Sequence, residues 1–152
     1  FDRSGDRAVS HIAQWKNNQW QPLAEGLNAA VLALAIDQNT LYASGRFTQA
    51  GSMSVNYIAQ WYQNHWLPLS GGLIYLAHPN FTEVHALTVH GDTVYAGGYF
   101  TQANNKNNAL SANYIAAWDI VQKEWRALGE GMDGMVSALV VVPNLEISPL
   151  GF

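Results

Sequence analysis

One short sequence phrase recurs three times along this chain. It reads Ile-Ala-x-Trp, and each copy continues through a short polar connection to a second tryptophan. Self-similarity at a regular period is the signature of a repeat architecture, in which one supersecondary unit is stacked several times. The six tryptophans of the chain all fall in these units, as the pairs Trp15 and Trp20, Trp61 and Trp66, and Trp118 and Trp125.

Apolar segments of strand length alternate with the tryptophan units. They cover residues 31–36, 84–89 and 136–142, and each contains Ala-Leu at the same place. After the first two, a polar turn leads back through residues 41–45 and 94–98. Runs rich in β-branched residues and bounded by turn residues predict strands. We therefore expect two hairpins, and so four short strands, in each copy of the repeat.

The copies cover about residues 1–46, 47–99 and 100–152, which together form a single segment of one fold. None of them has the 3.6-residue apolar period with caps at both ends that predicts a helix. In the first tryptophan strand, Ala13 faces one side and Ile12 faces the other. Apolar residues on both faces predict a sheet that is covered on both sides. The sequence therefore predicts an all-β chain of stacked sheets.

Further residues give the repeat a likeness to a known family. The small pair Gly97-Gly98 closes one strand, the pair Trp118-Asp119 closes another, and Trp125 follows shortly after. At these points, and in its Phe-Thr-x-Ala-Gly and Ile-Ala-x-Trp phrases, the chain resembles the kelch-like β-propeller repeat of secreted or surface proteins. The resemblance implies β-propeller-type four-stranded blades, about three blade equivalents in this chain, and an extracellular or cell-surface location.

The repeat departs from the family pattern in places. Ser44 stands where the pattern has its first glycine, and Lys16 and Tyr62 stand where it has the acidic residue. Residues 145–152 keep a final phenylalanine but lose the tyrosine and the small pair. Three copies of a four-strand unit also fit a β-trefoil, which is the alternative fold. The small strand ends and the two-sided apolar strands favour the propeller.

In the frame of that family, the chain begins and ends in mid-blade. It supplies an outer hairpin at its N-terminus and an inner hairpin at its C-terminus. Propellers have about four to eight blades, so an arc of about three leaves sheet edges and apolar faces open. We expect a piece of a larger propeller, because both ends lie at like points of the repeat and no initiator methionine is present. The alternative is an oligomeric assembly of copies, as a closed ring or a filament.

The composition excludes several classes of function. The net charge is −4 and the seven Lys and Arg residues are scattered, so no basic face predicts nucleic-acid binding. The chain has no cysteine, which excludes a disulfide framework, thiol catalysis and cysteine-ligated zinc. It also excludes the Cys–Tyr cross-link that galactose-oxidase-type propellers need. No apolar run reaches the roughly 18 residues of a membrane span.

The ionisable residues form no recognisable catalytic or metal-binding motif. His85 and His90 lie on a predicted strand and at its turn, where they should face differently, and neither His65 nor His78 adjoins a carboxylate cluster. The acidic residues show no pairing suited to acid and base work, and no Gly-x-Ser-x-Gly motif occurs. We therefore expect no cofactor, no metal site, no catalytic residue and no enzymatic activity.

An insertion at residues 71–83 is the main candidate for binding. It lengthens a loop of the second copy and carries Tyr75 and Phe81. Flat aromatic faces suit the apolar face of a sugar ring, so these residues and Trp66 are the loop candidates for binding. The recurrence of the tryptophans favours a packing role for Trp66 between blades instead.

Two further loop features bear on the surface of the protein. The tripeptide Asn80-Phe81-Thr82 is an N-glycosylation sequon, so Asn80 is a candidate site of modification in a secreted protein. A second insertion, residues 104–112, is rich in asparagine but has no carboxylate for a metal ion. We expect it to be a solvated connection.

The leading interpretation is a non-enzymatic extracellular or surface module with a structural or interaction role. Its partners would be copies of itself or the remaining blades of a longer chain. The alternatives are a carbohydrate-binding module that contacts glycans, and a fragment of a larger propeller enzyme. For the blades themselves we expect burial to be highest on the inner strands, at Ala33, Leu34, Ala86, Leu87, Ala138 and Leu139.

Overall fold

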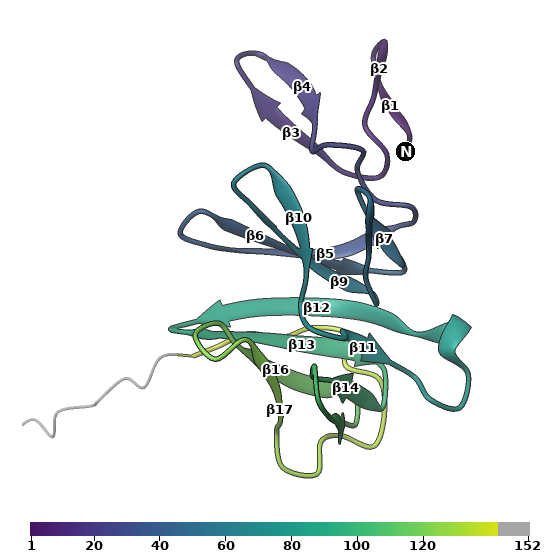
Figure 1. The fold of residues 1–152 in the computed structure, drawn as a ribbon, viewed down its shortest axis with the longest axis vertical. Helices are drawn as coiled ribbons and strands as arrows, with labels where there is room; N and C mark the ends of the chain where they lie inside the picture. Colours follow the sequence, from purple (N-terminus) through teal and green to yellow (C-terminus); the bar gives the residue numbers. More distant parts are fainter. Residues whose placement is uncertain (143–152) are drawn as a thin grey trace, which may run out of the picture.

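The structure is a computed structural model that describes residues 1–142 of the chain. It is 50% strand and 2% helical, which confirms the prediction of an all-β chain. The strands pair antiparallel in several sheets, and none of the sheets in the described range closes on itself (Figure 1). The helical part is a single 3₁₀ turn, η1 (Pro79–Phe81).

Two four-stranded sheets make up the centre of the molecule. Each is an up-and-down meander, in which strands that follow one another along the chain lie side by side. The first sheet has the order β10–β9–β6–β5 and contains β5 (Val31–Asp37), β6 (Thr40–Gly45), β9 (Ile58–Tyr62) and β10 (His65–Pro68). The second sheet has the order β12–β13–β16–β17 and contains β12 (Glu83–His90), β13 (Thr93–Tyr99), β16 (Ile115–Asp119) and β17 (Glu124–Ala127).

Smaller hairpins flank the two sheets. The N-terminal hairpin, β3 (Ala13–Lys16) and β4 (Gln19–Pro22), corresponds to the last two strands of each sheet. In all three of these outer hairpins, the two tryptophans of a repeat are direct cross-strand partners. The remaining strands are β1 (Arg3–Ser4), β2 (Arg7–Ala8), β7 (Gln49–Ala50), β8 (Met53–Ser54), β11 (Leu73–Ile74), β14 (Gln102–Asn104) and β15 (Ala109–Ser111).

The asparagine-rich insertion is more ordered than the sequence predicts. The prediction that it is a solvated connection is wrong in part, because β15 pairs with β14 there. The Asn105 side chain also donates to the Trp125 carbonyl and accepts the Trp125 backbone N–H. An amide side chain offers both a donor and an acceptor, so one asparagine can satisfy both backbone groups at a strand edge.

Local turn chemistry explains the tight outer hairpins. Asn17 and Asn18 have φ of 53° and 60°, and Gln63 and Asn64 have φ of 48° and 63°. Two successive residues with positive φ form the type I′ turn, whose twist matches that of the strands it joins. In the second sheet the connection is longer, and the Asp119 carboxylate accepts backbone N–H groups of its own turn. Such an Asx arrangement replaces the missing strand pairing.

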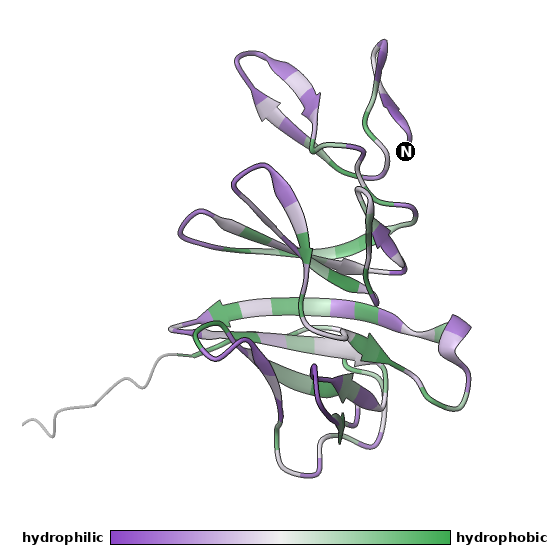
Figure 2. Ribbon diagram, in the orientation of Figure 1, coloured by the Kyte–Doolittle hydropathy of each residue, from purple (hydrophilic) through white to green (hydrophobic). Residues whose placement is uncertain are grey.

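The sheets pack face to face, with the N-terminal hairpin on the first sheet and the first sheet on the second (Figure 1). Successive residues of β6 and β9 enter different clusters. Tyr42 and Ile58 belong to the core shared with the second sheet, whereas Ala43 and Ala59 belong to the core shared with the N-terminal hairpin. The prediction of strands covered on both faces is therefore confirmed for β6 and β9, but not for β5, where Leu34 and Ile36 are exposed. Hydrophobic colour runs along the strands of the first sheet, and hydrophilic colour marks the hairpin tips (Figure 2).

One hydrogen bond recurs between successive layers. The indole N–H of Trp66 donates to the Leu23 carbonyl over 3.0 Å, and that of Trp125 donates to the Leu69 carbonyl over 2.9 Å. Each acceptor lies three residues after the tryptophan of the preceding layer that matches the donor. Both indole rings are buried, and the same contact therefore joins the layers at both junctions.

A glycine is required where each layer connects to the next. Gly72 has φ of 70°, and a Cβ there would lie 2.5 Å from the Asn56 carbonyl oxygen. That oxygen accepts the backbone N–H of Leu73 over 3.2 Å, which draws the two segments together. Gly26 and Gly131 repeat the positive φ and the close approach to a carbonyl. Any larger residue would meet both a steric and a conformational penalty there.

The expectation that the inner strands are the most buried is wrong. Among the six named positions, only Ala86 is buried, while Leu34 and Ala138 are exposed. Burial is instead highest on middle strands, above all β16 and β6, because these strands have a neighbouring strand on both sides. Residues 136–142 form no strand, contrary to prediction, and residues 145–152, which were expected to return beside them, lie outside the described residues.

Candidate functional site

The insertion at residues 71–83 forms an anchored loop beside the second sheet (Figure 1). The backbone N–H of Tyr75 donates to the Thr82 hydroxyl over 2.8 Å, and Thr82 is buried. The Tyr57 hydroxyl donates to the Pro79 carbonyl over 2.8 Å and so holds the tip of the loop. These bonds fix the loop in one conformation, which lowers the ordering cost of any ligand contact it makes.

The loop and the end of the second sheet enclose a pocket of about 450 Å³, called the aromatic pocket below. The rings of Tyr75 and Tyr99 lie 4.4 Å apart, tilted by 43°. The ring of Phe81 lies 5.8 Å from that of His78, nearly perpendicular to it. The pocket is lined by Tyr75, His78, Phe81, Glu83, Tyr99 and Met135. The two loop residues expected to bind, Tyr75 and Phe81, therefore line the same pocket.

Among residues 1–142, Glu83 supplies the only carboxylate that lines this pocket. One of its oxygens lies 2.7 Å from the Arg46 Nε and the other lies 2.7 Å from the His85 Nε2. Glu83 begins β12 of the second sheet and Arg46 follows β6 of the first, so the ion pair also joins the two sheets. Because its partner is the always-cationic guanidinium, the carboxylate adds little net negative charge to the pocket.

The Tyr99 hydroxyl of the pocket is held in its neutral form. The side-chain interaction with the Tyr75 hydroxyl raises the pKa of Tyr99, and partial burial and the neighbouring Tyr75 and Tyr114 add to the rise. The rings of Tyr99 and Tyr114 lie 5.8 Å apart, so the aromatic surface continues beyond the pocket. The pocket thus combines aromatic faces, hydroxyl groups and a neutralised carboxylate.

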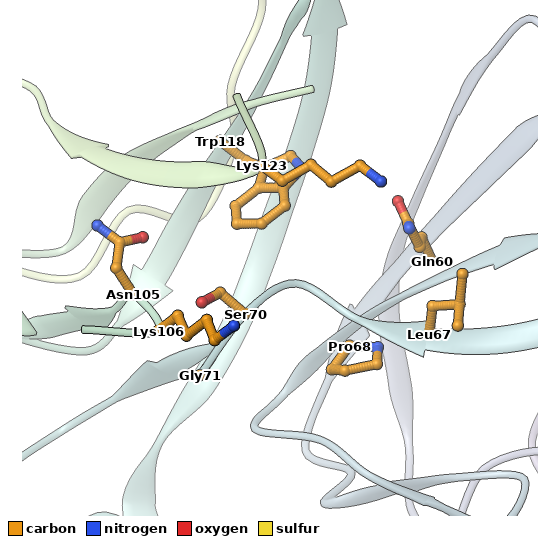
Figure 3. A pocket seen from close by; sticks show the side chains of 9 residues that line it. All are labelled: Gln60, Leu67, Pro68, Ser70, Gly71, Asn105, Lys106, Trp118 and Lys123. Atoms are coloured by element: carbon orange, nitrogen blue, oxygen red, sulfur yellow. The ribbon is translucent and has the colours of Figure 1, made fainter. Parts of the chain in front are cut away.

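A larger pocket, of about 590 Å³, opens between the outer hairpins of the two sheets (Figure 3). Gln60 and Leu67 line it from the first sheet, and Trp118 lines it from the second. Lys123 and Gln60 extend toward each other across its mouth (Figure 3). Its Trp118 ring is part of the core between the sheets, so this pocket is the outer opening of that packing surface.

The structure separates Trp66 from the other two binding candidates. Trp66 is 4% exposed, and it packs between the first sheet and the N-terminal hairpin. With its N–H bonded to the Leu23 carbonyl and its ring buried, it offers little surface to a ligand. Trp15 and Trp20, by contrast, are exposed, because no further layer covers their side of the N-terminal hairpin in the described residues. Asn80 is exposed within η1, whereas the threonine of its sequon is buried.

The histidines do not gather in one place. Within residues 1–142, no three His, Asp or Glu side chains form a group that could hold a metal ion. Only His78 lines the aromatic pocket, and His85 contacts it through Glu83. In the same range, no helix is long and apolar enough to cross a membrane.

Sequence reasoning missed Glu83, Arg46 and Tyr99 as parts of this site. Arg46 and Tyr99 hold the same repeat position, directly before the Phe-Thr phrase. A position that changes its residue between copies, while its neighbours repeat, is a signal of a variable rim. That signal could have drawn attention to both residues.

Comparison of the chain with protein-family models and with curated proteins finds no match. The interpretation of function below therefore depends on the residues and on the geometry described above.

Proposed function

We propose that this chain is an arc of kelch-like β-propeller blades that acts as a non-enzymatic structural or interaction module at a cell surface or outside the cell. Its two outer faces would be covered by further sheets of the same kind. Those sheets would come from copies of the chain or from the remaining blades of a longer chain. The open meanders, stacked face to face, support a propeller over a β-trefoil, because a trefoil closes on itself.

The observation that carries the proposal is the repeated tryptophan contact between layers. Trp66 and Trp125 each donate to a carbonyl of the preceding layer. Trp20 holds the same repeat position but is 46% exposed, and its N–H has no acceptor within residues 1–142. At the other end, Leu128 occupies the position of the acceptors Leu23 and Leu69 and is itself exposed. A donor and an acceptor of the same contact thus face outward at opposite ends.

The apolar face of β5 supports the same proposal. Leu34 and Ile36 are 53% and 69% exposed. The matching residues of β12 are Leu87 and Val89, which pack against the core shared with the first sheet. Soluble proteins seldom leave such contiguous apolar surface uncovered unless it is an interaction site. Covering each of these side chains would contribute about 1–2 kcal/mol.

In the described residues, the N-terminal hairpin lacks the inner neighbouring strand that the equivalent hairpin of the first sheet has. In the first sheet, β9 has β6 as its inner neighbour, whereas the equivalent β3 pairs only with β4 in the described residues. A pocket of about 400 Å³ runs along β3 and β5 at that place and is lined by Ile12 and Leu34. An inner hairpin of the same repeat would fill it, with strand pairing on one side and apolar contact on the other.

Sedimentation equilibrium of the chain tests the proposal. We expect association that increases over about 5–500 μM and is abolished by Ile36→Lys, because a charge would then be buried at the face. Val121→Lys is the matched control, since Val121 is also 63% exposed but lies in a turn. A chain that stays monomeric over the whole range would contradict coverage by copies of the chain. Equal association in the Ile36→Lys variant would contradict the role of the β5 face.

A further inference from the structure

The aromatic pocket has a free ring face that the rest of the molecule does not use. Phe81 is 64% exposed, although it lies in a loop held by internal hydrogen bonds. The His78 ring lies nearly perpendicular to the Phe81 ring, and most of the Phe81 side chain stays open to solvent. Tyr75 and Tyr99, whose centroids are 4.4 Å apart, provide a second aromatic wall. Exposing this much rigid aromatic surface is unfavourable in water, so a ligand that covers it would gain from the burial.

The charges around the pocket select against charged ligands. The guanidinium of Arg46 already neutralises Glu83, so a cation would find the carboxylate engaged and a positive charge behind it. An anion would find the Arg46 guanidinium already paired with Glu83, whose second oxygen contacts His85. Both oxygens can still accept further hydrogen bonds, since a carboxylate has about four lone-pair sites. The polar groups therefore suit a neutral ligand with several hydroxyl groups.

We propose that the aromatic pocket binds a neutral pyranose sugar, with Phe81 stacked on the apolar face of the ring. The Glu83 carboxylate accepts hydrogen bonds from the sugar hydroxyls, and the Tyr75 hydroxyl donates to them or accepts from them. A volume of about 450 Å³ is within the size range of small-ligand sites. The site requires neither an open sheet face nor self-association, so its test is independent of the module's assembly.

The position of the pocket fits a ligand site on such a repeat scaffold. Glu83 is the first residue of β12, Tyr99 is the last residue of β13, and Met135 comes from the segment after the sheet. All three lie at a strand end or in the connection beside one. Loops at the ends of a rigid scaffold are the usual place for binding residues, because they can vary without disturbing the packing.

Saturation-transfer NMR and calorimetry on the 152-residue chain test this site. The neutral probes are cellohexaose, laminarihexaose, mannohexaose and xylohexaose, and the charged probes are phenyltrimethylammonium and hexagalacturonate. At least one neutral hexaose is expected to bind with a dissociation constant below about 1 mM. Phe81→Ala should weaken that binding about three- to tenfold, which is the range of one aromatic stacking contact.

Tyr62→Ala is the matched control, because Tyr62 is an exposed aromatic residue on β9, away from the pocket, and its loss should leave the affinity unchanged. Tyr75→Ala provides a second pocket variant. If it fails to fold, the exposed Phe81 variant, checked by circular dichroism, still decides the question. The proposal is overturned if none of the four hexaoses saturates the protein. It is equally overturned if Phe81→Ala leaves the affinity unchanged, or if only a charged probe binds in a Phe81-dependent way.

Discussion

Replacing tryptophan by phenylalanine at three equivalent repeat positions tests whether the layers stack through one repeated contact. The three positions are Trp20, Trp66 and Trp125. Trp66 and Trp125 are 4% and 1% exposed and donate to carbonyls of the preceding layer, whereas Trp20 is 46% exposed. The substitution is chemically identical in each case, so any difference in its cost measures the surroundings of the residue.

The structure sets the expected magnitude. At Trp66 the change removes one buried hydrogen bond, worth about 1 kcal/mol, and leaves a void from the smaller ring that costs about 1–2 kcal/mol. The Leu23 carbonyl still accepts a hydrogen bond from the backbone N–H of Gly26 over 3.0 Å, so the substitution does not leave this acceptor without a donor. Trp125 should behave alike, because the Leu69 carbonyl also keeps a backbone donor. The expected loss is about 2–3 kcal/mol at both sites and less than about 0.5 kcal/mol at Trp20.

Urea unfolding followed by circular dichroism measures these costs, since fluorescence would change with each lost tryptophan. In thermal scans the two buried variants should melt about 5–10 °C lower than the parent chain. The measurement belongs at low protein concentration, where a self-associated Trp20 face would be open. Equal losses at all three positions would refute the reasoning, and so would a loss below about 0.5 kcal/mol at Trp66.

Three further predictions concern other parts of the chain. Gly72→Ala should lower the free energy of unfolding in urea by about 3 kcal/mol or more, because the new Cβ would lie 2.5 Å from a carbonyl oxygen. Gly91→Ala is the control: Gly91 also has positive φ but open space around it, so the cost should be about 1 kcal/mol. Similar costs for the two substitutions would contradict this prediction. The pKa of Asp119 is lowered by hydrogen bonds from backbone N–H groups of its own turn and by the charge of Arg126. The ionised carboxylate therefore stabilises the fold above about pH 4, and this contribution is lost as the pH falls through the lower native pKa. An NMR titration should show that low midpoint, raised in Arg126→Gln; a native midpoint at the ordinary value would be inconsistent with the geometry. When the chain is secreted from a eukaryotic host, we expect a glycan at Asn80. Mass spectrometry should show an added mass that a glycosidase removes and that the Asn80→Gln variant lacks. A secreted chain without this mass would refute the prediction.

The strands of the repeat could be predicted because their pattern is local. The tryptophan phrase places β9 and β16 within one residue of their observed limits, and the apolar runs place β5 and β12 similarly. Apolar residues on both faces of the tryptophan strand predicted that both faces are covered, which holds for β9. What a strand needs in order to form is written in its own residues and in the turns beside it.

Burial could not be predicted in the same way, because it depends on neighbours. Leu34 and Leu87 hold the same repeat position, yet Leu34 is exposed and Leu87 packs against the core between the sheets. Likewise, the sequence does not distinguish Trp20 from Trp66. Each difference arises from whether another layer lies on that side, and no local pattern encodes the presence of a layer.

The candidate site was predictable only in its loop residues. Tyr75 and Phe81 stand out because the insertion interrupts the repeat. Glu83, Arg46 and Tyr99 come from two sheets and three strand ends, and their approach depends on how the sheets twist against each other. Such long-range geometry is absent from a single sequence read along its length.

The outward-facing residues indicate whether further layers cover the array. Repeat arrays that end in solvent usually carry polar residues on their outermost faces, since these capping units keep the array soluble. The first sheet instead keeps Leu34 and Ile36 on its uncovered face, and the N-terminal hairpin keeps Trp15 and Trp20. Each of these residues matches one that is packed in the next layer. Uncovered faces built like covered ones support an array that is continued by further layers.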